Sequence, residues 1–283
     1  MIYVSSSCVR KKKIKDSVEN LALNGIKNIE LSGGTEYYDS FVDDLLELKD
    51  KYNLNYLCHN YFPPPKEHFV LNLASLNDEI YEKTFDHHLE AIELSKKLGA
   101  NKFGFHAGFF IDPRVRELGK KLSKDSIVNK DEAIDKFCNG FDKLKELAGT
   151  LKLYIENNVF SITNYKTFEG INACMLTNFT EYQQLKKKIN FNLLLDVAHL
   201  KVSSNSFSLN FEEEFKDMMA ISDHIHISDN DALHDTNNVL KKDSNLVKLL
   251  NQQDLNGKDF TLEIYDGMEA INKSHEILSE VVI

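Results

Sequence analysis

The segment FNLLLDVAHL, residues 191–200, shows the pattern that decides the fold. An apolar run of strand length ends in Asp196, and His199 follows three residues later. A carboxylate at the end of a buried strand is costly unless it pairs with a cation or binds a metal. The segment therefore predicts a buried strand whose last residue faces a polar site.

Similar apolar runs recur along the chain and alternate with longer stretches in which apolar residues follow helical spacing. The expected strands cover residues 2–4, 28–31, 54–59, 102–106, 151–156, 191–196, 224–227 and 260–264. The expected helices cover residues 17–23, 41–51, 79–98, 130–147, 179–188, 211–221, 246–253 and 268–278. Eight strands alternating with eight helices predict an α/β fold, a (β/α)8 TIM barrel that occupies residues 1–283 as a single domain.

A doubly wound open sheet has the same alternation and is the structural alternative. Polar residues follow the strand ends almost everywhere along the chain, whereas an open sheet gathers its ligand groups near one switch point. The connections after strands are long, at 107–129, 157–178 and 228–242, and those before strands are short, at 99–101 and 149–150. Long connections on one face predict a pocket there, which favours the barrel.

Composition narrows the class of protein. Hydrophobic residues make up 42% and charged residues 28% of the 283, which excludes disordered and collagen-like chains. No apolar stretch reaches membrane-spanning length, and the first ten residues have no signal-peptide core, so we expect a cytoplasmic protein. The four scattered cysteines indicate neither a disulfide framework nor a thiolate zinc site. The net charge of −10 and the three arginines weigh against a nucleic-acid-binding protein.

Metal-ligating residue types stand at the ends of most expected strands. They are Glu30, His59, His106, Glu156, Asp196, His226 and Glu263. Glu156, Asp196, His226 and Glu263 come from four successive strands, and together they predict a divalent-metal site. His224, two residues before His226, faces the same side of its strand but lies deeper, so we expect it beneath the site. Gly104 and Gly108 flank His106 and are expected to let a ligand approach the backbone.

This set of strand-end residues resembles that of the xylose isomerase-like barrel superfamily over essentially the whole chain. The superfamily includes sugar and sugar-phosphate isomerases and epimerases, and the endonuclease IV branch. The resemblance implies one divalent ion (Mn²⁺, Mg²⁺, Co²⁺ or Zn²⁺) on the four residues, and proton transfer by Glu156 and Glu263 through an enediolate of a small carbohydrate. It also implies substrate contacts from His59, His106, His199 and Asp235.

The endonuclease IV branch, which cleaves DNA at abasic sites with zinc, is the alternative. Its three-zinc set would match His59, His106, Glu156, Asp196, His199, His226, Asp235 and Glu263. The branch has an Asp-x-His sequence after strand 7, whereas this chain has Asp235-Thr-Asn237. Asparagine is a poor substitute for an imidazole in a zinc site, so nucleic acid is an unlikely partner. A binding protein that kept the barrel and lost catalysis is the third interpretation.

Overall fold

The computed structural model describes residues 1–282 and shows a closed barrel of eight parallel strands. The last strand pairs with the first through Val4 and Leu262, so the sheet has no open edge. The barrel prediction is therefore confirmed and the open sheet is excluded; Ile283, which the predicted domain includes, lies outside the described residues. The strands are β1 (Ile2–Ser5), β2 (Asn28–Leu31), β3 (Asn55–His59), β4 (Lys102–His106), β5 (Lys152–Glu156), β6 (Asn192–Asp196), β7 (His224–Ile227) and β8 (Asp259–Leu262).

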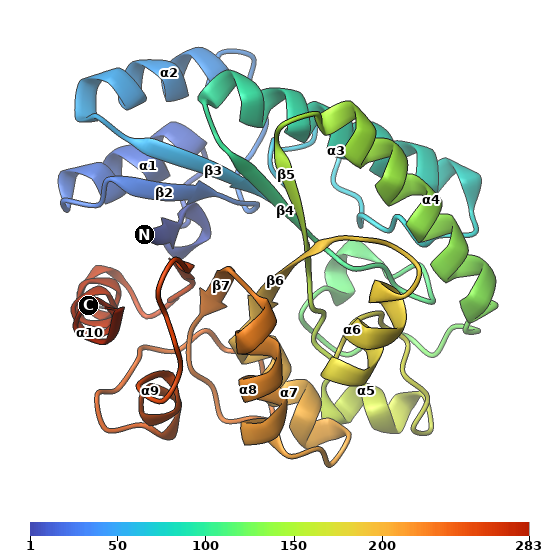
Figure 1. Cartoon of the computed structure of the whole chain (residues 1–283). Helices are drawn as coiled ribbons and strands as arrows, with labels where there is room; N and C mark the ends of the chain where they lie inside the picture. Colours follow the sequence, from blue (N-terminus) through green and yellow to red (C-terminus); the bar gives the residue numbers. More distant parts are fainter. Residues whose placement is uncertain (283) are drawn as a thin grey trace.

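Helices surround the ring of strands (Figure 1). They are α1 (Ile14–Leu23), α2 (Phe41–Tyr52), α3 (Asp78–Leu98), α4 (Lys130–Ala148), α5 (Ile162–Thr167), α6 (Phe179–Lys186), α7 (Val197–Ser206), α8 (Phe211–Ile221), α9 (Asn245–Leu250) and α10 (Met268–Val282). Each of the eight predicted helices is present. No helix among residues 1–282 is both long enough and apolar enough to cross a membrane.

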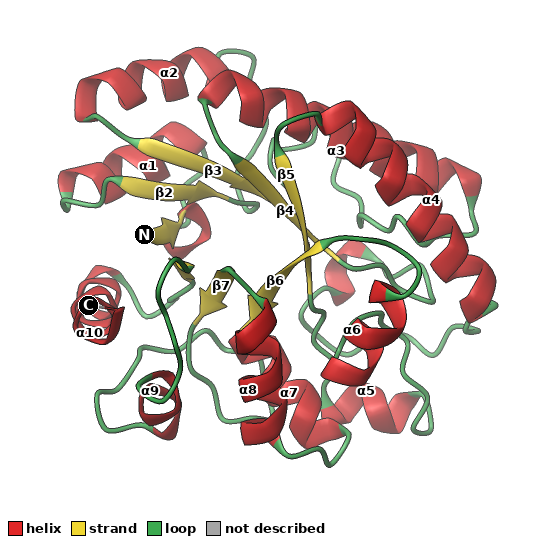
Figure 2. Cartoon of the chain, in the orientation of Figure 1, coloured by secondary structure: helices red, strands yellow, loops and turns green. Residues whose placement is uncertain are grey.

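Two helices, α5 and α7, were not predicted (Figure 2). Helix α7 directly follows β6, and its buried residues include Ser203, Ser204 and Ser206. Because serines occupy buried positions, the helix lacks the apolar stripe that reveals a helix in a sequence. Helix α5 has only six residues and lies within the connection 157–178.

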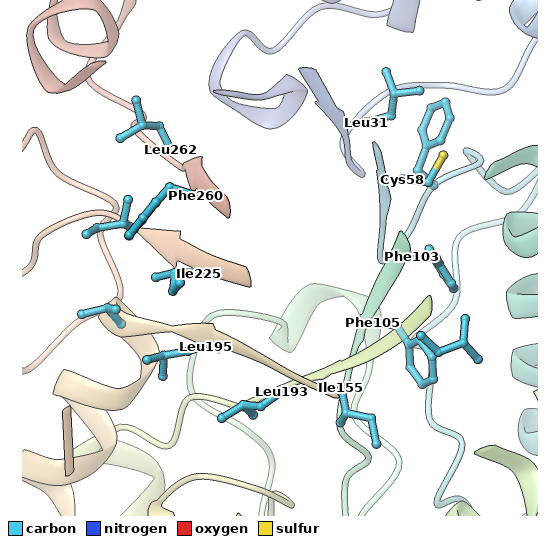
Figure 3. Close-up of a cluster of buried hydrophobic side chains, with 14 of the residues drawn as sticks. Leu31, Cys58, Phe103, Phe105, Ile155, Leu193, Leu195, Ile225, Phe260 and Leu262 are labelled. Atoms are coloured by element: carbon cyan, nitrogen blue, oxygen red, sulfur yellow. The ribbon is translucent and has the colours of Figure 1, made fainter. Parts of the chain in front are cut away.

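Alternate residues of each strand face opposite sides of the barrel wall. In β6, Leu193 and Leu195 belong to the large apolar cluster between the strands and the helices, whereas Asp196 ends the strand on the inner side. Figure 3 shows such apolar residues from most of the strands around the barrel. The inward-facing residues at the carboxyl ends of the strands are polar, so the barrel presents a polar mouth on an apolar scaffold.

Two long connections after β4 and β5 are joined to each other at this mouth. The backbone N–H of Phe110 donates to the carbonyl of Ala173 at 2.8 Å, and that of Met175 donates to the carbonyl of Gly108 at 2.9 Å. The side-chain amide of Asn158 donates to the carbonyls of Ala107, Gly108 and Met175. The two connections also share a small buried cluster made of Ile111, Leu122, Phe160, Phe168, Ala173 and Cys174. They form one wall of the mouth.

The buried His88 of α3 makes stability depend on pH. Its ring packs on Phe105 at 4.2 Å between centroids, and burial, with a smaller effect of His87, lowers its pKa well below 6.5. Above pH 6.5 the residue is neutral in both states. Below that pH only the unfolded chain takes up the proton, so the folded state loses stability by up to about 1.4 kcal/mol per pH unit.

We therefore expect His88→Leu to flatten the pH dependence of unfolding. Between pH 7.5 and 5.5 the fall in unfolding free energy, measured by urea denaturation, should shrink by roughly 1.4 kcal/mol relative to the unchanged protein. His68→Leu, at an exposed position, is the control and should leave the slope unchanged. An unaltered slope in His88→Leu would show that this histidine is not the buried neutral group.

Candidate metal centre

The structure brings the predicted strand-end residues together at the mouth of the barrel. Three of these residues are buried near the carboxyl ends of their strands and face the barrel interior: Glu156 in β5, Asp196 in β6 and His226 in β7. Glu263 lies one residue beyond β8 rather than inside it, and its backbone N–H still donates to the carbonyl of Ile227 at 3.2 Å. The extension holds the Glu263 side chain beside the other three.

Glu156 lies at the centre of four imidazoles. Its Oε2 atom is 3.0 Å from Nε2 of His59 and 3.1 Å from Nδ1 of His106. Its Oε1 atom is 3.6 Å from Nδ1 of His226 and 3.7 Å from Nδ1 of His199. Burial alone would raise the pKa of Glu156, but the imidazoles, His106 and His59 foremost, lower it well below its usual range. The residue is therefore a carboxylate at neutral pH.

Glu30 of β2 fixes the orientation of His226 from below. The Nε2 atom of His226 lies 2.6 Å from Oε1 of Glu30, so a proton on Nε2 donates to this carboxylate. The other oxygen of Glu30 accepts from Thr261 at 2.7 Å and lies 3.1 Å from Nε2 of His224. His224 thus lies beneath the site, as its spacing predicted. Burial lowers the pKa of His226, but Glu30, Glu263 and Glu156 raise it to about 10. A metal bound at Nδ1, which faces Glu156 and Glu263, would take the place of the proton there.

One oxygen of Asp196 accepts a hydrogen bond, and the other lies 3.8 Å from Nε2 of His199. Its Oδ1 atom caps α7 by accepting the backbone N–H of His199 at 2.7 Å. Its own N–H donates to Oδ1 of Asn157 at 2.7 Å. Burial, together with the carboxylates of Glu156, Asp235 and Glu263 and against the effect of His199, raises the pKa of Asp196 to about 7. Crowding of negative charge here would be relieved by a bound cation.

His199 and Asp235, both predicted to contact substrate, face each other. Nε2 of His199 lies 3.2 Å from Oδ2 of Asp235, and Nδ1 donates to the carbonyl of Asn157 at 2.9 Å. Burial acts to lower the pKa of His199, but Asp196 and Asp235 raise it well above the ordinary value. His106 differs, because burial lowers its pKa to about 3 and a quarter of its side chain is exposed.

The residues present fit a divalent metal. Ligand atoms of Asp196, His226 and Glu263 all lie within 4.8 Å of one another, and two further trios join Glu156 to His59 and His226, and to His106 and His199. Within these trios, Nδ1 of His226, Nδ1 of His106 and Oε2 of Glu156 are buried without a hydrogen bond. Buried polar atoms without partners are rare in folded proteins, and a cation among them would satisfy them.

The expected role of the glycines around His106 is wrong. A Cβ atom on Gly104 would lie 2.7 Å from Cδ1 of Leu194, and one on Gly108 would lie 2.4 Å from Cβ of Ala74. Protein atoms, not a ligand, fill the space that these glycines leave. They are needed for close packing of the barrel interior and of the loops at its mouth.

Two residues that organise the centre have roles that the sequence did not reveal. In the sequence, Glu30 is recognisable only as one of the strand-end residues. Asn157 is not among the residues predicted to bind metal or substrate. Asn157 clamps Asp196 and His199 by hydrogen bonds to their backbone and ring. Its position directly after Glu156 is the only signal that the sequence offers.

A cavity of about 940 Å³ opens above the centre. His59, His106, Glu156, His199 and Glu263 lie at its floor, together with Asp235 from the connection after β7. Its sides come from the connections that follow the strands. The predicted pocket at the carboxyl ends of the strands is therefore confirmed.

The fold is shared with several solved structures. A D-tagatose 3-epimerase-like protein superposes with a TM-score of 0.75 at 21% identity, covering 99% of this chain and 96% of that chain. D-allulose 3-epimerase from Methylomonas sp. gives 0.67 at 12% identity, covering 99% and 96%. Endonuclease IV from Thermus thermophilus gives 0.62 at 16% identity, covering 99% of both chains.

None of the curated proteins matches the chain. The family described as xylose isomerase-like TIM barrel matches residues 18–281. Because this match covers nearly all of the barrel, the chain belongs to the xylose isomerase-like TIM barrel family.

Proposed function

We propose that the protein is a divalent-metal-dependent isomerase or epimerase that moves a carbon-bound proton of a sugar or sugar phosphate. One observation carries this proposal: Glu156 ends β5 and Glu263 directly follows β8, on different sides of the mouth, and both carboxylates are within 4 Å of Nδ1 of His226. Two carboxylates beside one candidate metal site can reach a bound sugar from two directions.

Glu156, Asp196, His226 and Glu263 would hold the ion, in agreement with the ligand types that suit Mn²⁺, Mg²⁺, Co²⁺ or Zn²⁺. When bound, the metal supplies Lewis-acid polarisation of adjacent sugar oxygens and offsets the charge left when a carbon-bound proton departs. The protein's own contribution is to fix the ligands, since Glu30 orients His226 and Asn157 clamps Asp196.

Glu263 and Glu156 would exchange the proton with the substrate carbon. Burial raises the pKa of Glu263, and Glu156 and Glu30 add to this against the effect of His226 and His59. A raised pKa lies closer to neutral pH, and a carboxyl group with such a pKa can both accept and return a proton efficiently. His106, partly exposed to the cavity, would bind a substrate oxygen, and the Asp235–His199 pair borders the same space.

Solvent deuterium tests this reaction. Ketoses and ketose phosphates are incubated with the metal-loaded protein in deuterated water and examined by proton NMR. We expect deuterium to appear at the carbon next to the carbonyl. The same protein treated with a chelator is the control. A product that forms without solvent deuterium would show that hydride shift, rather than proton transfer by the two glutamates, operates.

The alternative is a zinc-dependent nuclease, and one observation favours it. His59, His106 and His199 crowd around Glu156, which gives more candidate ligands than a single metal needs. Against it stands Asn237, which is buried and accepts a hydrogen bond from Ser228 through Oδ1 at 3.2 Å. An amide occupies the position where the nuclease interpretation requires an imidazole.

We expect no cleavage of abasic duplex DNA by the zinc-loaded protein, measured by nicking of a labelled oligonucleotide. The Asn237→His variant is the matched comparison, because it restores the missing ligand type. Zinc-dependent nicking by the unchanged protein, abolished by chelator, would replace the isomerase proposal with the nuclease.

A further inference from the structure

The cavity is larger than one sugar ring requires. At about 940 Å³ it lies at the upper end of the 300–1,000 Å³ that is typical for drug-sized ligands. The metal-ligand candidates occupy only its floor. The rest of the cavity is therefore available for a part of the substrate that does not react.

Three cations border this remaining space. Arg10 follows β1, and Lys120 and Lys121 belong to the connection after β4. Among residues 1–282, no carboxylate oxygen lies within the 4.0 Å of an ion pair from any of these three groups. The chain has a net charge of −10, so three unpaired cations at one cavity mouth are a local excess of the opposite charge. Glu117, which lines the cavity in the same connection as the lysines, is itself paired with Arg114. The three cations therefore make the rim attractive to an anion.

Arg10 is held in place by an aromatic ring. Its guanidinium lies 4.5 Å from the centroid of Tyr265, and the hydroxyl of Tyr265 is 3.3 Å from Oγ of Ser7. Stacking fixes the guanidinium plane while leaving its N–H groups free for a planar or tetrahedral anion. Tyr265 lies two residues after Glu263, so the ring that holds Arg10 is close in the chain to the proposed proton carrier.

Two buried polar atoms line the same cavity without partners. Oγ1 of Thr35 and Oδ1 of Asn60 make no hydrogen bond, although these residues are only 5% and 3% exposed. The loop that carries Thr35 is joined to the loop after β1, because Glu36 N donates to the carbonyl of Lys12 at 2.8 Å. Unpartnered buried atoms of this kind call for a ligand with hydroxyl groups.

We propose that the substrate carries a phosphate or carboxylate group that Arg10 binds at the rim of the cavity, where Lys120 and Lys121 add positive charge. Thr35 and Asn60 bind hydroxyl groups of the same substrate. The inference rests on the proposed function, because it names the substrate class of that same site. The site therefore discriminates a sugar acid or sugar phosphate from the uncharged sugar.

Calorimetric titration of the metal-loaded protein tests this with three probes that lack a carbonyl: sorbitol, sorbitol 6-phosphate and gluconate. We expect at least one anionic probe to bind about tenfold or more tightly than sorbitol at low salt. The preference should disappear in Arg10→Gln. It should persist in Arg116→Gln, an exposed arginine that does not line the cavity. Comparing sorbitol 6-phosphate with gluconate decides between phosphate and carboxylate.

Several results would overturn the inference. These are equal affinity for all three probes, no binding of any probe, or a preference that Arg10→Gln does not change. Displacement of the anionic probe by abasic duplex DNA, lost in Arg10→Gln, would assign the cations to nucleic acid instead. The proposed reaction can be rejected independently of the anion site. If an anionic probe is preferred but no ketose phosphate exchanges deuterium, the anion site stands and the isomerase proposal is wrong.

Discussion

Glutamine in place of Glu156 or Glu263 is expected to lower kcat by about 10²–10⁴-fold or more. Glutamine has nearly the shape of glutamate but cannot accept a proton from carbon. The loss should appear in kcat and in the rate of deuterium incorporation into substrate. Glu213→Gln, an exposed glutamate of α8, is the matched control and should retain full activity.

Loss of metal would imitate loss of the base, so metal content must be measured in each variant. A variant with full metal and low kcat supports proton transfer by that glutamate. A variant that has lost its metal shows ligation, and excess metal should then restore activity. Full metal with unchanged kcat in both variants would remove the two residues from the proton-transfer role.

Glu30→Gln is expected to weaken metal binding by about 10–100-fold, the usual effect of removing a partner of a metal-binding histidine. Glu30 accepts from Nε2 of His226, and this contact directs Nδ1 toward the proposed metal. A glutamine can turn its N–H₂ group toward Nε2, which favours the opposite tautomer of the ring. The measurement is competition with a chelating dye, together with the visible spectrum of the Co²⁺-loaded protein.

Thr261→Val is the control for this variant. It removes the 2.7 Å hydrogen bond to the other oxygen of Glu30 but leaves the contact with His226 in place. We expect a smaller loss of metal affinity in the threonine variant than in Glu30→Gln. Equal affinities in Glu30→Gln and the unchanged protein would show that His226 needs no partner to bind the metal, or does not bind it.

The ends of several strands were predictable because the apolar run closes in a polar residue. In β6 the run closes at Asp196, and in β5 at Glu156, where the structure also ends the strands. The end of β8 was placed two residues too far, at 264 instead of Leu262. The hydrophobic pattern continues to residue 264, but the pairing with neighbouring strands ends at Leu262. Strand pairing depends on the neighbouring strands rather than on the local sequence.

The orientation of the site residues was beyond the sequence. Glu30 and His226 are 196 residues apart, so no local pattern connects them. His199 and Asp235 were each assigned to the substrate, yet they lie 3.2 Å from each other. That contact depends on the course of the connection after β7, where Asp229 and Asn238 pair backbone to backbone. Spacing along a chain identifies which residues reach the mouth, but not which of them meet.

The pairing of the connections after β4 and β5 has a consequence for exchanging parts between relatives. Asn158 gives its amide hydrogens to three carbonyls, two of which belong to the other connection. Replacing residues 107–129 alone with those of a distant relative would leave the amide hydrogens of Asn158 without their acceptors. It would also break the β-bridge between Phe109 and Cys174. The two connections therefore behave as one structural unit. A chimaera that changes this side of the mouth has to take both connections from the same parent protein.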